Sequence, residues 1–226
     1  MKKLFVLFII GSLNTSLFLG CVSAQSNEPF STYTFSALTM SSVHAVEATT
    51  LNGSLTVSGD ASSETVVEMY VSRNGSGFFR RALKEEEIKQ HLVENYTIEV
   101  KVAGEKLLVA ARQKKNKSSQ VSISFKIIVP GQMNSNLKTT NGTVQISNLT
   151  GSHKLETVNG SLKVENVSGK IYGSTTNGSV TVTNSNNDIN ISTVNGSITE
   201  TGCSGKINLT TVNGKINGQR VGYMNK

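Results

Sequence analysis

The chain has 226 residues, of which 37% are hydrophobic and only 16% are charged, and its formal net charge is +7. Its 2 Cys exclude a disulfide scaffold and a zinc site made of paired Cys motifs, and 2 Pro among 20 Gly exclude collagen. Low charge together with abundant Val, Ile and Thr argues against intrinsic disorder and predicts an all-β chain.

The N-terminus has the pattern of a bacterial export signal. Two lysines precede an apolar run that is too short and too interrupted for a transmembrane helix, which needs roughly 20 apolar residues. Two processing sites remain open. Cleavage after Ala24 would make 1–24 a signal peptide, whereas Gly20-Cys21 resembles a lipobox and would make Cys21 the lipidated N-terminus. In both cases we expect an exported protein in the periplasm, at the cell surface or secreted, with membrane contact only through a lipid anchor.

Residues 25–130 are expected to form an irregular N-terminal β region. Alternation of apolar and polar residues predicts strands at 65–71, 96–102, 106–110 and 121–129. The segment 82–95 predicts the one helix, because glutamates begin it and four apolar residues fall near one face, Leu83, Ile88, Leu92 and Val93. We expect this helix to cover one end or face of the sheet, as caps do in repeat proteins.

An 18-residue repeat fills residues 131–226. Asn-Gly recurs at this period in five copies, and one earlier copy precedes them, at Asn52-Gly53, Asn141-Gly142, Asn159-Gly160, Asn177-Gly178, Asn195-Gly196 and Asn213-Gly214. Each copy divides into two nine-residue halves in which apolar residues alternate as in a half-buried strand. Val164, for example, is expected to point inward and Lys163 outward.

The repeat allows two arrangements. Asn-Gly is the strongest short signal for a two-residue hairpin, so a stack of hairpins is one of them. The other is a coil whose strands pair in parallel with those of the next coil, about 4.8 Å away. We favour the coil because every nine-residue half has the same inward pattern. The predicted fold class is all-β: a parallel β-solenoid with 18-residue coils of two nonapeptide halves, capped by the irregular N-terminal β region.

Stacked coils would align equivalent residues in columns. The Asn side-chain amides could then bond up and down the stack as a ladder. A second polar ladder would consist of Thr139, Thr157, Thr175, Thr193 and Thr211. A third, apolar column would consist of Leu149, Val167 and Cys203, with an echo nine residues later at Val158, Val194 and Val212. We expect the Thr and Asn ladders, Thr157 and Thr175 included, to face outward toward a partner.

The strand ending at Val129-Pro130, the following LKTTNGTVQISNLTG and the TVNGS repeats resemble the bacterial adhesin-type domain of unknown function that occurs in many exported proteins. The resemblance covers about residues 43–218, which is most of the mature chain. It implies an exported, β-solenoid-like domain with an adhesive or surface role. It supplies no catalytic residues.

Few residues carry the chemistry of a metal site or an active site. Calcium-binding β-rolls need an Asp in every turn, and the chain has only Asp60 and Asp188, so we expect no metal. His153 occupies an inward column without further metal ligands at the right spacing, and Cys203 also takes an inward column, so both are interpreted as structural. A glycan-cleaving site needs an acid pair, which the scattered acids of the repeats, such as Glu165 and Glu200, do not supply.

The sequence therefore predicts a non-catalytic, exported binding module without a cofactor, whose partner is an unknown envelope or extracellular protein or glycan. Nucleic acid is not expected as a partner, because the basic stretch 112–117 contains no aromatic residue and is typical of a solvated loop. The alternative is a structural or envelope-stress accessory lipoprotein. A carbohydrate-active enzyme ranks third.

Overall fold

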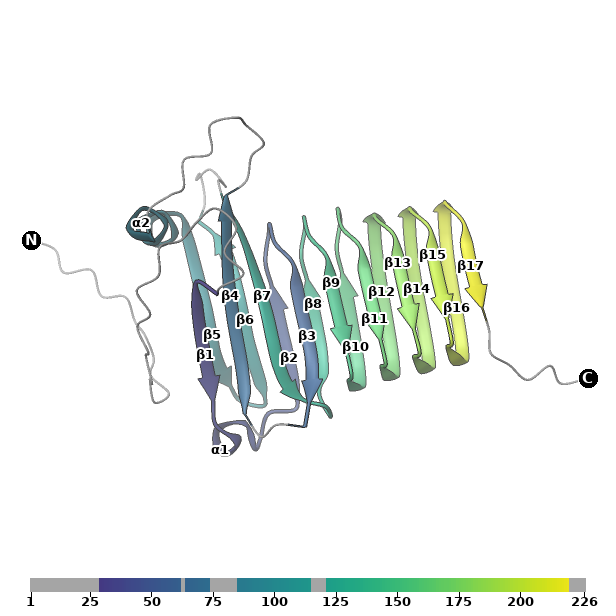
Figure 1. Ribbon diagram of the computed structural model, residues 1–226, viewed down its shortest axis with the longest axis horizontal. Helices are drawn as coiled ribbons and strands as arrows, with labels where there is room; N and C mark the ends of the chain where they lie inside the picture. The colour runs from purple at the N-terminus through teal and green to yellow at the C-terminus, as the bar shows by residue number, and fades with distance from the viewer. Residues whose placement is uncertain (1–28, 62–63, 74–84, 115–120, 220–226) are drawn as a thin grey trace, which may run out of the picture.

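The computed structural model describes residues 29–61, 64–73, 85–114 and 121–219. This part of the chain is predominantly β, and its strands lie side by side along the long axis of the molecule (Figure 1). They form two mixed sheets, one of nine and one of eight strands, in which most neighbours are parallel. Within the described residues the sheets do not close into a barrel. The signal peptide predicted at 1–24, with Cys21, lies outside the described residues.

The N-terminal elements are β1 Ser31–Phe35, α1 Ala37–Met40, β2 Ala45–Thr49, β3 Leu55–Asp60, β4 Thr65–Arg73, α2 Glu85–Asn95, β5 Tyr96–Ala103, β6 Lys106–Gln113 and β7 Val121–Pro130. The four strands predicted in this region correspond to β4, β5, β6 and β7. The predicted helix corresponds to α2, although residues 82–84 lie outside the described part.

The N-terminal region differs from prediction in its helices. The described residues contain a second helix, α1, which has only four residues and therefore no recognisable periodicity. Ser36 begins it, because its Oγ accepts a hydrogen bond from the Thr39 N–H at 3.3 Å. In α2, Ile88 and Leu92 are buried as expected, but Val93 is 44% exposed and does not belong to the buried face. This helix packs against β5 at the end of the molecule far from β17 (Figure 1).

The repeats contain β8 Asn134–Lys138, β9 Val144–Ser147, β10 Thr150–Glu156, β11 Leu162–Glu165, β12 Ser168–Asn177, β13 Val180–Thr183, β14 Asn186–Asn195, β15 Ile198–Thr201, β16 Ser204–Asn213 and β17 Ile216–Gln219. Odd-numbered strands from β9 belong to one sheet and even-numbered strands from β8 to the other. Each pairs in parallel with the strand 18 residues away, so that Leu162 lies beside Val180 and Val180 beside Ile198.

The pairing rules out the hairpin arrangement for the Asn-Gly turns. β10 and β11 flank Asn159-Gly160 but lie in different sheets. Asn159 instead forms parallel bridges with Asn141 and Asn177, one repeat before it and one after it. Each of these six Asn-Gly pairs therefore turns the chain from one sheet to the other, and its neighbours in space are other pairs of the same set.

The early copy of the motif continues the same stack but lies out of chain order. β2 pairs with both β6 and β8, and β3 pairs with both β7 and β9. The β2–β3 segment is thus inserted between β6–β7 and β8–β9. The chain leaving β7 passes close to the end of β3, where a Cβ on Gly59 would lie 1.9 Å from the Asn148 carbonyl oxygen and 3.0 Å from the Gly131 Cα. Only Gly fits at this crossing.

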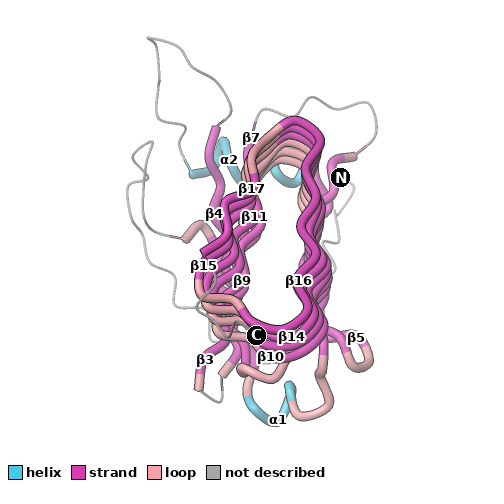
Figure 2. The backbone as a smooth tube through the Cα atoms, turned by 90° about the vertical axis from the view of Figure 1, so that its right-hand side faces the viewer, coloured by secondary structure: helices cyan, strands magenta, loops and turns pink. Residues whose placement is uncertain are grey.

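The core lies between the two sheets, which Figure 2 shows as facing walls seen along the stack. The inward positions of both sheets carry apolar side chains that are almost fully buried, and Val164 is only 1% exposed while Lys163 next to it is exposed. Leu149, Val167 and Cys203 are buried as predicted. The prediction of an equivalent column nine residues later is wrong, because Val158, Val194 and Val212 are exposed. No helix in the described ranges is long and apolar enough to cross a membrane.

Candidate functional site: an asparagine ridge

The Asn residues of the six stacked Asn-Gly pairs form one continuous hydrogen-bonded column. Asn141 donates from Nδ2 to Oδ1 of Asn52 at 2.6 Å, and Asn159, Asn177, Asn195 and Asn213 each donate to the preceding member at 2.8 Å. The residues from Asn141 onward are exposed. The ladder therefore runs along the outside of the stack, where it is accessible to a partner.

The Gly residues beside this ladder are required by close backbone stacking. A Cβ on Gly160 would lie 1.9 Å from the carbonyl oxygen of Gly142, and one on Gly178 would lie 2.0 Å from that of Gly160. No side chain fits at such distances. The Gly N–H groups also bond between repeats, since Gly160 donates to the Asn177 carbonyl at 3.0 Å. The Asn-Gly pair thus holds adjacent turns in register.

The Thr ladder does not face a partner, which corrects the prediction for Thr157 and Thr175. Their exposed fractions are 5% and 4%, and their hydroxyls donate to the carbonyl oxygens of Gly142 and Gly160 at 3.0 and 2.8 Å. Thr139, Thr193 and Thr211 make the same contact with Gly53, Gly178 and Gly196. The reason is the strand alternation of His153, Leu155 and Thr157, which places all three inward. The Thr column fastens the turns and leaves the Asn column as the outer one.

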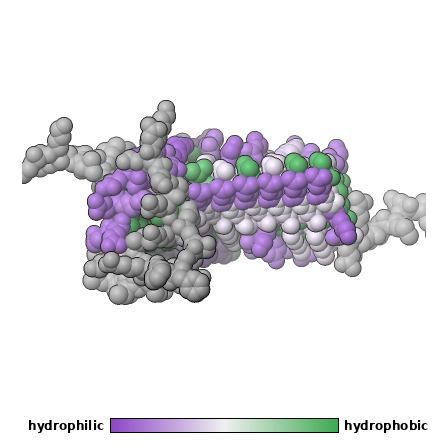
Figure 3. Space-filling view, turned by 90° about the horizontal axis from the view of Figure 1, so that it is seen from above, coloured by the Kyte–Doolittle hydropathy of each residue, from purple (hydrophilic) through white to green (hydrophobic). Residues whose placement is uncertain are grey.

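A second column lies beside the Asn ladder and is exposed from Val158 onward. It consists of the residues just before each ladder Asn: Leu51 and Thr140, which are half-buried, and Val158, Thr176, Val194 and Val212, which are exposed. Val158, Val194 and Val212 are 42%, 40% and 69% exposed. Figure 3 shows a straight hydrophilic row along the long axis, next to a row in which hydrophobic and near-neutral residues follow one another. We call these two columns together the asparagine ridge.

The second corner of each repeat is made by residues, mostly Asn, that were not singled out from the sequence. Asn148, Asn166 and Asn184 recur every 18 residues and have φ of 55°, 53° and 48°, and Gly202 takes the same place with φ 66°. Asn and Gly are the residues that tolerate this left-handed conformation. Asn166 also donates from Nδ2 to Asn148 Oδ1 at 3.2 Å. The 18-residue spacing of these Asn residues was a usable signal for the corner.

His153 and Cys203 are buried, as predicted. His153 is fully buried, its Nδ1 lies 2.9 Å from Ser135 Oγ in the preceding repeat, and its Nε2 has no partner among the described residues. Burial lowers the pKa of His153 to about 4. Burial likewise raises the pKa of the Cys203 thiol above its ordinary value. Both side chains are therefore neutral near pH 7 and pack as core residues.

The acids singled out in the sequence do not come together as a pair. Glu200 is 3% exposed, and its Oε1 accepts a hydrogen bond from the Cys203 backbone N–H at 2.9 Å. Glu165 is exposed and points outward from β11. Asp60 ends β3 and Asp188 lies in β14. In the part of the chain that the structure describes, no group of three or more His, Cys, Asp or Glu residues could hold a metal ion.

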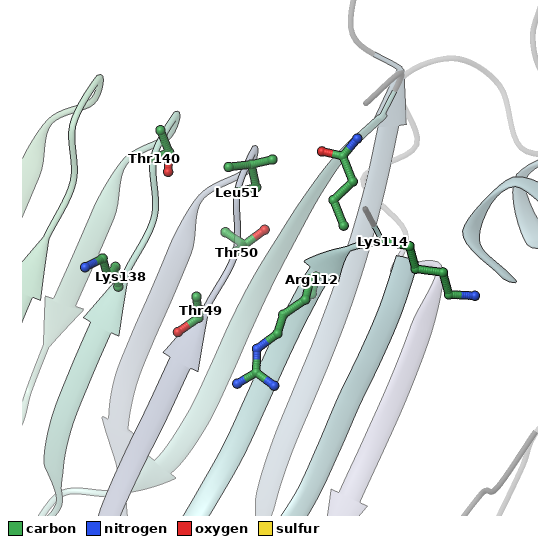
Figure 4. Close-up of a pocket in the computed structure, with 9 residues that line it drawn as sticks. Thr49, Thr50, Leu51, Arg112, Lys114, Lys138 and Thr140 are labelled. Atoms are coloured by element: carbon green, nitrogen blue, oxygen red, sulfur yellow. The ribbon is translucent and has the colours of Figure 1, made fainter. Parts of the chain in front are cut away.

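A shallow recess lies where β6 ends beside β2 and β8, next to the first residues of the asparagine ridge. Its lining includes three cations, Arg112, Lys114 and Lys138 (Figure 4). Their charged ends point in different directions, and each has a partner: Arg112 pairs with Glu99 at 3.0 Å, Lys114 donates to the Val93 carbonyl at 2.6 Å, and Lys138 pairs with Glu156 at 3.2 Å. Hydrogen bonds from Lys154 and Lys138 hold the pKa of Glu156 below its usual value. The recess is therefore not a convergent anion site. The rest of the basic stretch, 115–117, lies outside the described residues.

Comparisons with known proteins give little further identification. No protein-family model and no curated protein matches the chain. The crystal structure of a "putative cell adhesion protein" from Clostridium sporogenes is similar at 12% identity and a TM-score of 0.34, covering 85% of this chain and 100% of that chain. A likeness this distant carries no argument about function, and the family resemblance seen in the sequence stays a prediction.

Proposed function

We propose that β8 to β17 form a parallel β-solenoid with 18-residue coils of two nonapeptide halves. The support is the constant register, because neighbouring strands are offset by 18 residues in both sheets, from Leu137–Leu155 to Asn195–Asn213 in one and from Val144–Leu162 to Ile198–Ile216 in the other. The alternation between sheets within each repeat supports the division into two halves. The position of the domain boundary near residue 130 remains part of this proposal.

The function that this geometry supports best is that of an exported, non-catalytic and adhesin-like binding module that presents the asparagine ridge to an extended partner. One observation carries the proposal, namely the unbroken exposed ladder from Asn141 to Asn213 with the exposed valines beside it. Export rests on the N-terminal sequence pattern alone.

The ridge suits a polymer better than a compact ligand. Within the ladder each middle Asn uses one amide N–H and one carbonyl lone pair, and a carboxamide has a second of each. These groups therefore repeat at the strand spacing of about 4.8 Å, next to apolar contact surface. An extended glycan or peptide can use the same contact several times along its length. A small molecule binds best in a concave apolar pocket, which the ridge does not offer.

The binding test compares two charge-matched double variants of the purified chain on immobilised envelope polysaccharides and matrix proteins. Val158→Glu with Val194→Glu places two carboxylates on the ridge, and we expect affinity for the probe that binds to fall roughly tenfold or more, because charges are desolvated there. Thr181→Glu with Thr199→Glu adds the same charge to the exposed face of β13 and β15 and should leave binding unchanged.

Thermal unfolding of both variants is the control, and it should show that each keeps the fold. The proposal is wrong if no probe binds the unmodified chain, or if the ridge variant binds as well as the control. Turnover of a glycan probe, abolished by Glu165→Gln or Glu200→Gln, would replace the binding module with the carbohydrate-active enzyme.

A further inference from the structure

Asn-Gly pairs can undergo an intramolecular reaction between the Gly backbone and the Asn side chain, and the fold affects its rate. The backbone nitrogen of the Gly can attack the Asn side-chain carbon Cγ, and Gly permits this because it carries no side chain to hinder the approach. The reaction requires the Gly N–H to lose its proton and the Asn carboxamide to rotate toward it. Hydrogen bonds that hold either group in place therefore slow the reaction.

In five of the six Asn-Gly pairs that make up the ladder, the Gly N–H is held by the next repeat. It donates to the carbonyl oxygen of the Asn stacked above it, at 2.8 Å for Gly53, 3.1 Å for Gly142, 3.0 Å for Gly160, 3.1 Å for Gly178 and 3.2 Å for Gly196. Each of these N–H groups therefore points along the stack toward the next repeat. Attack would first require breaking that bond.

The Asn carboxamides inside the ladder are held at both ends. Asn177, for example, donates from Nδ2 to Asn159 and accepts at Oδ1 from Asn195, both at 2.8 Å. Rotation of this carboxamide toward Gly178 breaks both bonds. The internal pairs are thus protected twice, once at the attacking nitrogen and once at the attacked carbon.

The last pair of the ladder, Asn213-Gly214, has neither of the bonds that the earlier ladder pairs receive from the next repeat. Asn213 donates from Nδ2 to Asn195 at 2.8 Å, but no described residue donates to its Oδ1. Among the described residues the Gly214 N–H likewise has no acceptor, whereas the equivalent Gly196 N–H bonds to Asn213 itself. Gly214 is also exposed.

We propose that Asn213 is a site of spontaneous covalent modification and that, among the six stacked pairs of the ladder, the hydrogen bonds confine this chemistry to the last one. The Gly214 nitrogen loses its proton and bonds to Asn213 Cγ, and the side-chain nitrogen leaves as ammonia, which gives a cyclic succinimide. Water then opens either carbonyl bond of the ring to give aspartate or isoaspartate. No oxidant or reductant takes part.

The modification changes the open end of the asparagine ridge. The product carries a carboxylate in place of the amide, so the N–H donor to Asn195 is lost and two oxygens face each other instead. Isoaspartate also lengthens the main chain within the turn that leads to β17, which weakens the pairing of Ile216 with Ile198. The ridge thus acquires a negative charge at one end as the protein ages.

The experiment follows deamidation of the folded chain at neutral pH by peptide mass spectrometry, with fragmentation to locate the modified residue. Deamidation at Asn213 is expected to be about tenfold or more faster than at Asn159, Asn177 or Asn195, which corresponds to the net strength of one or two hydrogen bonds. The rate at Asn213 should increase with pH, because the attacking nitrogen must be deprotonated.

The same measurement in concentrated urea is the control, since the unfolded chain has no ladder. All Asn-Gly pairs should then react at similar rates. Equal rates at Asn213 and Asn177 in the folded chain would overturn the proposal. A preference for Asn213 that persists unchanged in urea would also overturn it, because the cause would then be the local sequence and not the stacking.

Discussion

At the scale of single residues, Thr, Asn and Gly each have a different structural role in the Thr-x-Asn-Gly corner. The Thr hydroxyl satisfies a Gly carbonyl from the preceding repeat inside the stack, and the absence of a Gly side chain allows that carbonyl to approach. The Asn amide bonds to its own copies on the outside. Stacking of the coils therefore requires the Thr and the Gly of the motif. Only the Asn and the residue before it remain available to contact a partner.

His153 makes stability depend on pH. Its pKa is about 4 in the folded protein and 6.5 in the unfolded chain, so between these values the unfolded chain binds a proton that the folded protein excludes. The free energy of unfolding should therefore fall as the pH decreases from 6.5 toward 4, by about 3 kcal/mol in total from this residue.

Urea unfolding across this pH range checks the expectation, with His153→Ile as the matched variant, because Ile171 and Ile189 occupy the same column. Carboxylates titrate in both proteins, so the difference between the two isolates the histidine. If the free energy of unfolding changes equally in the two proteins from pH 6.5 to 4, His153 does not contribute to the pH dependence.

At the scale of strands and turns, the register could be predicted because the repeat has no insertion from Asn141 onward. The position of β2–β3 in the stack could not be predicted. Asn52, which follows β2, bonds to Asn141, which is 89 residues away in the sequence, and a connection of that length allows the segment to lie on either side of its neighbours. The prediction that the Thr side chains face outward was wrong for a different reason. Polarity suggested outward Thr side chains, whereas alternation from Leu155 places Thr157 inward, and in a fully paired stack the alternation prevails. Of the asparagine ridge, the Asn column was predictable and the exposed valine column was not.

Strand β11 offers a direct test of the inward and outward positions. Val164→Ala should lower the free energy of unfolding by about 1–3 kcal/mol, because the side chain is 1% exposed and its removal leaves a cavity between the sheets. Lys163→Ala, one residue away on the exposed face, should change it by less than about 0.5 kcal/mol. Chemical denaturation measures both, and equal losses would contradict the assignment of the faces.

At the scale of the whole molecule, the two ends of the stack are built differently. At the N-terminal end β1, β4 and β5 pair antiparallel with their neighbours, and α2 packs against β5. At the other end β16 and β17 are the last strands of their sheets in the described part of the chain (Figure 1). Ile216 is 46% exposed there, and Ile207 and Leu209 are only partly buried. Packing therefore weakens toward β17 within one continuous structure.

This asymmetry predicts a gradient of local stability along the stack. Amide hydrogens that bond between β12 and β14 should exchange most slowly, because strands pair on both sides and Ile171 and Ile189 are buried beneath them. Amides of β17 should exchange fastest among the repeats, because the strand pairs only with β15 and opening it exposes little apolar surface. Hydrogen exchange with peptide mass spectrometry measures this directly, and the equivalent amides of β13 and β15 serve as internal controls because they share the same register. Exchange from β17 as slow as from β13 would contradict the gradient and would mean that something covers the last strands in solution.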